Sequence, residues 1–191
     1  MSTKKYKSSG TPDKQEEKNS IGKEILSWIE VFVIAAAIAF VINNFLIANS
    51  VVPTGSMEPN IMTGARVFGS RLTYLNSDPQ RGDVVIFHWP DDEKVYFVKR
   101  VIGLPGETVD IIQGQVYING EPLDEPYLAE PMYPGEEPMH FEVPENAYFM
   151  MGDNRNYSAD ARYWDNTYVY KDKIIAKVGL KYWPFPIEKV R

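Results

Sequence analysis

The segment Ile25 to Ala48 constrains the fold most, because it is almost entirely apolar and Glu30 is its only charged residue. As an α-helix it would be roughly 36 Å long, enough to cross a bilayer core of about 30 Å. We therefore predict one transmembrane helix over residues 25–48. The alternative is a cleavable signal peptide, cut after Ala48-Asn49-Ser50. Its central apolar run is short enough for that, but the tail before it is long for a signal peptide.

Residues 1–24 are rich in Lys, Ser, Glu and Gln and have few apolar side chains, so we predict a disordered tail. Its six lysines outnumber its four acidic residues, and the first charge after the apolar segment is Glu58. Positive residues stay on the cytoplasmic side of a membrane. We therefore expect a single-pass protein of the cell membrane, with a cytoplasmic N-terminus and an extracytoplasmic domain over residues 49–191.

Composition narrows what this outer domain can do. The chain has a net charge of −6 and no basic stripe with interleaved aromatic residues, which argues against nucleic-acid binding. It has no cysteine, which excludes disulfides and thiol nucleophiles, and its only histidines are His88 and His140. A histidine-based metal cluster is therefore nearly excluded, and we predict no metal site and no cofactor.

The outer domain reads as mainly β. Short runs of β-branched and aromatic residues alternate with Gly, Pro, Asn and Asp turn signals. The predicted strands cover residues 66–70, 84–87, 95–102, 109–112, 115–118, 148–151 and 173–180. Gln113-Gly114 is a predicted hairpin turn. Residues 122–144 are acidic and proline-rich, so we predict an excursion from the sheet there.

Directly after the apolar segment comes Val51-Val52-Pro53-Thr54-Gly55-Ser56-Met57-Glu58-Pro59. Its two prolines exclude a helix interior, and Gly55 permits a tight turn or a close backbone approach. The stretch therefore presents one small hydroxyl, that of Ser56, on constrained backbone. From these residues alone, Ser56 is either a nucleophile beside a membrane or part of a linker.

Lys99 lies in the predicted strand 95–102, where alternate residues share a face. If the face of Val95, Phe97 and Val101 is buried, Lys99 is desolvated and its amine is pushed towards the neutral form. A neutral amine can accept a proton from a serine, as a Ser–Lys pair requires. Because the opposite face carries Arg100, the strand alone does not decide which cation is buried.

Two other features leave alternatives open. The polar stretch from Gly152 to Arg162 is either a solvated turn with a surface Asp160–Arg162 pair, or a loop beneath a site in which Ser158 orients another group. A Ser-His-Asp triad would pair Ser56 with His88 or His140. No motif surrounds either histidine, which favours a surface or structural role for both.

Four blocks in this order resemble bacterial type I signal peptidase of the Gram-positive form. They are Pro53-Thr54-Gly55-Ser56-Met57-Glu58-Pro59, Arg81-Gly82-Asp83-Val84-Val85, Val98 to Gly106, and Gly152-Asp153-Asn154-Arg155 with Ser158, Asp160 and Arg162. The resemblance covers most of the chain outside the tail and the acidic excursion. It implies a mainly β, signal-peptidase-like catalytic domain behind one transmembrane helix.

The resemblance also implies a membrane-anchored serine endopeptidase that removes signal peptides from secreted preproteins after small residues, through an acyl-enzyme. Its partners would be preprotein signal peptides and the bilayer, close to the secretion translocon. Ser56 falls at the nucleophile position and Lys99 at the general-base position. Thr54 matches the residue whose side chain forms half of the oxyanion hole, and Ser158 matches the serine that orients the lysine. Asp160 and Arg162 match a pair that braces the site. Asp153 and Arg155 would support the site. The family usually has Ser where this chain has Ala161, which removes one supporting hydroxyl.

A non-catalytic relative, a membrane-tethered β-domain that chaperones secreted or pilus subunits, is the alternative from another class. Such a protein would not need Ser56, Lys99 and Ser158 together.

Overall fold

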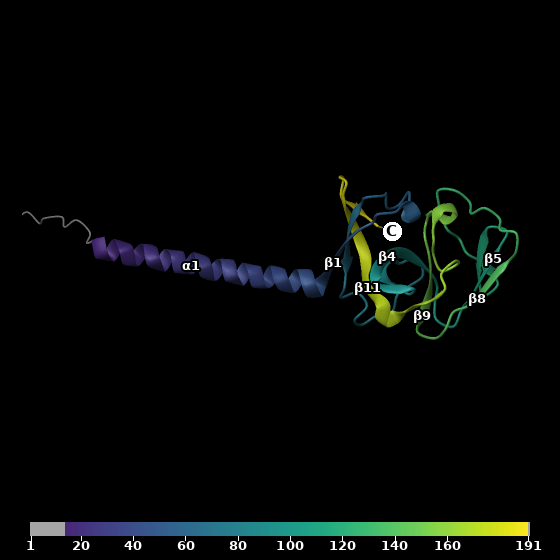
Figure 1. The fold of residues 1–191 in the computed structure, drawn as a ribbon, viewed down its shortest axis with the longest axis horizontal. Helices are drawn as coiled ribbons and strands as arrows, with labels where there is room; N and C mark the ends of the chain where they lie inside the picture. The colour runs from purple at the N-terminus through teal and green to yellow at the C-terminus, as the bar shows by residue number, and fades with distance from the viewer. Residues whose placement is uncertain (1–13, 191) are drawn as a thin grey trace, which may run out of the picture. The chain divides into compact units, whose positions relative to one another are not determined.

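The computed structural model describes residues 14–190 and divides into two compact units between Ile42 and Asn43. The first unit is the helix α1, Lys14–Val41, and the second is a β-domain (Figure 1). The large apolar side chains of α1 between Ile25 and Val41 are exposed, and those of Leu26, Trp28 and Phe32 are each more than 60% exposed. A helix that is apolar on all sides and unburied needs a non-aqueous environment. The stretch Lys23–Leu46 has the length and composition of a membrane span.

Both predicted ends of this helix differ from the structure. Residues 1–13 of the predicted disordered tail lie outside the described residues, but residues 14–24 are helical. Lys, Gln and Glu are good helix formers, and extending an existing helix is easier than starting one. At the other end the α-helix stops at Val41, a π-helical turn covers Ile42–Leu46, and Ile47–Val51 forms strand β1. Ile47 and Ala48 therefore pair in a sheet instead of ending the span.

The main sheet of the β-domain has eight strands, paired antiparallel throughout in the order β1-β2-β11-β3-β4-β9-β10 with β12 on β11. Their bounds are β2 Arg66–Ser70, β3 Val84–Trp89, β4 Asp92–Gly103, β9 Ala147–Met151, β10 Val169–Tyr170, β11 Ile174–Trp183 and β12 Glu188–Lys189. The mainly β prediction is confirmed, and β2 coincides with its predicted range.

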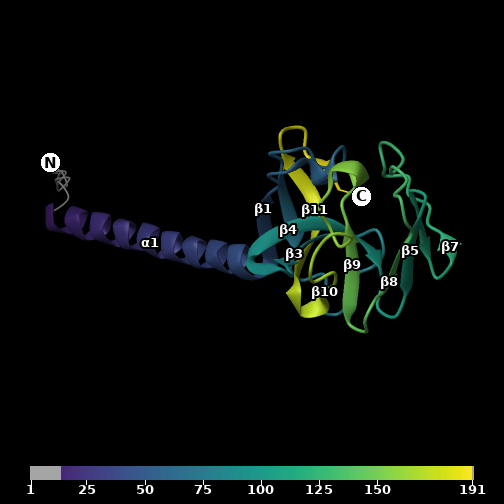
Figure 2. The same cartoon turned by 45° about the vertical axis from the view of Figure 1, so that its right-hand side comes forward.

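A second sheet has four strands in the order β7-β6-β5-β8. They are β5 Thr108–Ile112, β6 Gln115–Ile118, β7 Glu121–Pro122 and β8 Met139–Glu142. Gln113 and Gly114 turn between β5 and β6 with positive φ, which confirms the predicted hairpin. Figures 1 and 2 show this sheet on the β9 side of the main one. The acidic excursion is only partly outside the sheets, because β8 lies within it and pairs with β5.

Strand β4 lies between two apolar clusters, and its second half is buried on both faces. Phe97 and Val101 pack in the cluster that contains Phe87 and Phe149, whereas Val98 packs in the other cluster with Ile86 and Met57. The strand is exposed from Asp92 to Tyr96 and buried from Val98 to Gly103. In this second half both faces are buried, so Lys99 and Arg100 are both withdrawn from water, at 3% and 1% exposure.

Candidate active site

Ser56 lies in a 3-10 turn, Gly55–Met57, and is 6% exposed. The next residue, Met57, is fully buried in the apolar cluster of Ile86 and Val98, which anchors the turn to the main sheet. Before the turn, the Val52 N–H donates to the Ala65 carbonyl (2.9 Å), and the Gly64 N–H donates to the Val52 carbonyl (2.8 Å). Ser56 is therefore part of the folded core region of the β-domain, and the linker alternative is wrong.

Lys99 is placed by the pairing of β4 with β3, where it lies opposite Val85. Its Nζ donates a hydrogen bond to Ser158 Oγ at 3.1 Å. Burial lowers the pKa of Lys99 to about 8, because removal from water disfavours the ammonium form. The carboxylates of Asp160 and Asp153 act in the opposite direction, while Arg162 lowers the pKa further. Near neutral pH an appreciable fraction of this amine is therefore uncharged.

Ser56 and Lys99 line one cavity of about 280 Å³. Most of its wall is apolar and comes from the chain before Ser56 and from β4: Val51, Val52, Pro53, Val95, Tyr96, Phe97 and Val98, with Thr54, Tyr157 and Ala159. Ser56 Oγ accepts a hydrogen bond from Thr54 Oγ1 at 3.4 Å. Each member of the pair thus has its own hydroxyl partner, Thr54 for Ser56 and Ser158 for Lys99.

The stretch from Gly152 to Arg162 packs directly against the turn that carries Ser56. The Asn154 N–H donates to the Ser56 carbonyl, and its side-chain Nδ2 donates to the Gly55 carbonyl, both at 3.0 Å. A Cβ added at Gly152 would lie 2.3 Å from Ser158 Oγ and 2.4 Å from the Ser56 carbonyl oxygen. The absence of a side chain at Gly152 therefore lets Ser158 and the Ser56 turn approach the same backbone.

Buried ion pairs brace this region. Arg100 makes two hydrogen bonds of 2.7 Å to the Asp153 carboxylate, and the two side chains are 2% and 0% exposed. Arg162 pairs with Asp160 at 2.7 Å, with 3% and 0% exposure. The Asp160 carboxylate also accepts the Gly152 N–H at 3.0 Å. The alternative of a solvated turn with a surface pair is therefore wrong.

All eight sequence-predicted site residues lie in this region: Thr54, Ser56, Lys99, Asp153, Arg155, Ser158, Asp160 and Arg162. Sequence reasoning missed Gly152 and Asn154 as contacts of the Ser56 turn, although both stand in a block that it had singled out. It also missed Glu125, which forms a buried ion pair with Arg155. Glu125 stands in the acidic excursion, and among so many carboxylates no sequence signal distinguished it.

Neither histidine reaches Ser56. The Nδ1 atom of His88 lies 2.6 Å from the Glu93 carbonyl oxygen, and that of His140 lies 2.5 Å from an Asp110 carboxylate oxygen in the second sheet. Neither side chain lines the cavity of Ser56. Within residues 14–190 no group of three or more His, Asp and Glu side chains could hold a metal ion.

Comparison with known proteins points in one direction. A family model described as signal peptidase, peptidase S26, matches residues 25–183. A probable signal peptidase I-2 of Synechocystis sp. is 37% identical over 84% of this chain and 75% of its own length. Signal peptidase I S of Bacillus subtilis is 40% identical over 78% of this chain and 84% of its own length. A solved signal peptidase I from Enterococcus faecalis V583 is 34% identical, covers 53% of this chain and 97% of its own, and superposes with a TM-score of 0.46.

Proposed function

This chain belongs to the signal peptidase family, peptidase S26, and on that premise we propose that it cleaves preproteins with a Ser–Lys dyad formed by Ser56 and Lys99. Its activity is that of signal peptidase I, the removal of signal peptides. The observation that carries the dyad is the position of Lys99, a buried amine in the same cavity as the Ser56 hydroxyl.

In the first step Ser56 Oγ attacks the carbonyl carbon of the scissile peptide bond, and its proton passes to Lys99 Nζ. The low pKa of Lys99 makes this transfer feasible near neutral pH, because the neutral amine has a free lone pair. Ser158 Oγ, 3.1 Å from Nζ, fixes the direction of that lone pair. The hydrogen bond from Thr54 leaves the hydroxyl hydrogen of Ser56 available for the base.

The negative charge that develops on the carbonyl oxygen needs donors. Thr54 Oγ1 and the backbone N–H of Ser56 are the proposed pair, and a donor of this kind contributes about 2.7–4 kcal/mol to transition-state stabilisation. Thr54 bonds to Ser56 Oγ in the free protein. Once Oγ becomes bonded to the substrate, this donor can turn to the oxyanion.

The protonated Lys99 then gives its proton to the leaving amine, and the new N-terminus of the mature protein departs. Ser56 keeps the signal peptide as an ester, the acyl-enzyme. A water molecule activated by Lys99 hydrolyses that ester and regenerates the dyad. Asp153, Asp160 and their arginine partners stabilise the loop that carries Ser158, without touching the reacting atoms.

Cleavage after small residues accords with the cavity. Its wall is mainly apolar and close to the dyad, which suits short apolar side chains of an extended signal peptide. We propose that residues from Val51 to Thr54 and from Val95 to Val98 contact the residues that precede the scissile bond.

The membrane position is part of the same proposal. The stretch Lys23–Leu46 would anchor the protein in the bilayer with its lysine-rich N-terminus in the cytoplasm, and the β-domain would lie outside, near the secretion translocon. Along the sequence, Ser56 follows this stretch closely, with only the short strand β1 and residues 52–55 between them.

Ser56→Ala and Lys99→Ala in the full detergent-solubilised chain test the dyad. We expect each to lower preprotein cleavage by about six orders of magnitude, the cost of losing the nucleophile or the base of a serine protease. A serine-reactive penem should label Ser56 in the wild-type protein. It should label the Lys99→Ala variant slowly or not at all. Cleavage at the wild-type rate by Lys99→Ala would remove the dyad, and retention of turnover by Ser56→Ala would remove the nucleophile.

A further inference from the structure

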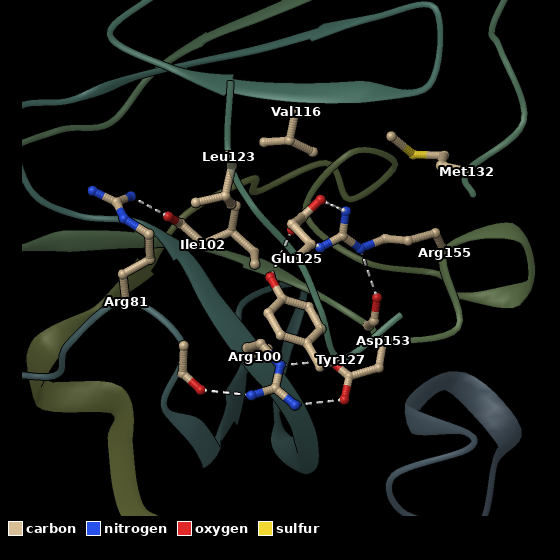
Figure 3. A network of polar contacts seen from close by, with 12 residues as sticks. Arg81, Arg100, Ile102, Val116, Leu123, Glu125, Tyr127, Met132, Asp153 and Arg155 are labelled. Carbon is tan, nitrogen blue, oxygen red and sulfur yellow. Dashed lines mark hydrogen bonds and ion pairs between the residues drawn. The ribbon is translucent and has the colours of Figure 1, made fainter. Parts of the chain in front are cut away.

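A short segment of the acidic excursion, residues 123–127, contacts Arg100 and Arg155, two buried arginines near Ser56 and Lys99. We call this segment the strap. It follows β7 and is attached at both ends. The Leu123 N–H donates to the Val116 carbonyl at 2.8 Å, and the Tyr127 carbonyl accepts a hydrogen bond from Asn60 Nδ2, also at 2.8 Å. Between these points the strap directs Glu125 and Tyr127 toward two arginines (Figure 3).

The Glu125 carboxylate is only 7% exposed and is fully engaged. It pairs with the guanidinium of Arg155, whose Nη1 donates to Oε2 at 2.8 Å, and it accepts the Tyr127 hydroxyl at 2.6 Å. The Arg155 side chain is 1% exposed. Burying a cation this deeply is costly unless a carboxylate compensates it, so Arg155 depends on Glu125 to keep its position.

Tyr127 contacts the second arginine. Its ring centroid lies 4.0 Å from the guanidinium carbon of Arg100, within the range of a cation–π contact. Arg100 is the neighbour of Lys99 in β4 and is also held by Asp153. The strap thus links Arg100 to Arg155 through Tyr127 and Glu125. Dashed lines in Figure 3 mark the hydrogen bonds and ion pairs of this region.

Arg155 leads back to the reacting groups. Its Nε donates to the Gly152 carbonyl at 3.0 Å, and its own carbonyl accepts a bond from Arg162 at 2.7 Å. Gly152 is the residue against which both Ser158 and the Ser56 carbonyl are packed. An Arg155 that moved towards water would therefore release the loop that sets Ser158 against Lys99.

We propose that Glu125 and Tyr127 are positioning residues for signal-peptide cleavage, acting through Arg155 and Arg100 on the loop that carries Ser158. The inference rests on the proposed dyad and assigns a role to the acidic excursion. Neither residue touches the substrate, and neither lines the cavity of Ser56. Their effect is on the geometry of the proton transfer, so it should appear in kcat and leave substrate binding largely unchanged.

Glu125→Gln tests this, because the amide keeps the shape of the side chain and removes its charge. We expect kcat for a signal-peptide substrate to fall about 10- to 100-fold, the scale on which small misplacements of catalytic groups act, with KM changed less than about threefold. Penem acylation should slow by the same factor as kcat.

Two controls separate positioning from loss of stability. Asp124→Asn changes the neighbouring, exposed carboxylate of the strap. Glu107→Gln breaks another two-point pair, in which Arg81 donates to Glu107 at 2.9 and 2.6 Å and to the carbonyl of Ile102. We expect wild-type kcat in both, even where Glu107→Gln lowers the Tm as much as Glu125→Gln does.

The proposal is overturned if Glu125→Gln has the kcat of Glu107→Gln, or if its KM rises while kcat stays constant.

Tyr127→Phe keeps the ring on Arg100 and loses only the hydrogen bond to Glu125, so it remains informative if Glu125→Gln does not fold. A two- to fivefold drop in kcat is expected there, which corresponds to about 0.4–1 kcal/mol of activation free energy. An unchanged kcat would overturn the proposal. Because Ser56→Ala tests the nucleophile separately, an inactive Ser56→Ala beside a fully active Glu125→Gln would remove the strap's role and leave the dyad standing.

Discussion

The β-domain contains two kinds of ion pair, and they differ in what surrounds them. Around Ser56 and Lys99, three arginines pair with three carboxylates, and all six side chains are at most 7% exposed. At the domain surface, pairs such as Lys171–Asp78 are 42% and 67% exposed at a similar distance of 2.5 Å. The charges are of the same kind, but only the first group has given up its hydration.

This difference shows how the site obtains a neutral amine. In the cluster each arginine pairs with a carboxylate: Arg100 with Asp153, Arg155 with Glu125 and Arg162 with Asp160. Lys99 has a hydroxyl, that of Ser158, and no carboxylate at hydrogen-bonding distance in the described part of the chain. Burial therefore acts on Lys99 with less compensation than on the arginines, and its pKa falls. The buried pairs stabilise the loop without supplying Lys99 with a counter-ion of its own.

The largest effect on stability should come from breaking a buried pair. Asp153→Asn leaves the guanidinium of Arg100 in place without its counter-ion, at 2% exposure. We expect the free energy of unfolding to fall by about 3–5 kcal/mol, the range for an uncompensated buried charge. Urea unfolding of the full chain in detergent, followed by tryptophan fluorescence, measures this. A loss below 1 kcal/mol would mean that the buried pairs behave like those at the surface.

Lys99 itself should lower stability. Its pKa is about 8 in the folded protein against an ordinary 10.5, so below pH 8 the folded state carries a buried ammonium that the unfolded chain solvates freely. Lys99→Met removes this penalty, which a shift of that size places on the order of 3 kcal/mol. The variant should therefore be more stable than the wild-type protein at pH 7, although it is inactive.

The stability difference between Lys99→Met and the wild-type protein should depend on pH. Between pH 8 and 10.5 the folded amine is neutral while the unfolded one still binds a proton, so wild-type stability rises with pH relative to Lys99→Met. The difference between the two proteins should shrink across this window and vanish above it. Parallel stability curves from pH 7 to 10.5 would contradict a desolvated Lys99.

The rate of catalysis should follow the same titration of Lys99. Only the neutral form of Lys99 accepts the proton of Ser56, so kcat/KM should rise about tenfold per pH unit below the pKa and level off above pH 8. Initial rates on a signal-peptide substrate between pH 6 and 10 give this profile. A rate independent of pH between 6 and 8 would show that Lys99 is not the base.

The sequence predicted the strands better than the charges. A short run of β-branched and aromatic residues after a turn signal identified β2, and Gln113-Gly114 identified the hairpin, because both signals are local. The state of Lys99 stayed open, since each face of β4 carries one cation and the burial of both faces depends on two separate apolar clusters. The residues alone made Lys99 a candidate, and only the likeness to a family assigned it the role of the base.

The remaining misses have the same cause. Glu125 meets Arg155 across 30 positions of sequence, and nothing local marks it among its acidic neighbours. The end of the apolar helix was missed because Ile47 and Ala48 are as apolar as a membrane span, and their pairing with Ser70 and Gly69 in β2 determines their conformation. Contacts that join distant segments leave no periodic pattern in either of them.

The smallest effect should come from the surface pair. Asp78→Asn removes the contact with Lys171, but both side chains already share their charge with water, at 67% and 42% exposure. An exposed pair of this kind contributes about 0–1 kcal/mol, and we expect a change within about 0.5 kcal/mol at 0.15 M salt. Repeating the urea titration at 1 M salt should reduce even that difference, while the loss in Asp153→Asn should persist because salt screens buried charges much less. If Asp78→Asn cost as much as Asp153→Asn, exposure would not be what separates the two kinds of pair, and the site would need another explanation for its neutral amine.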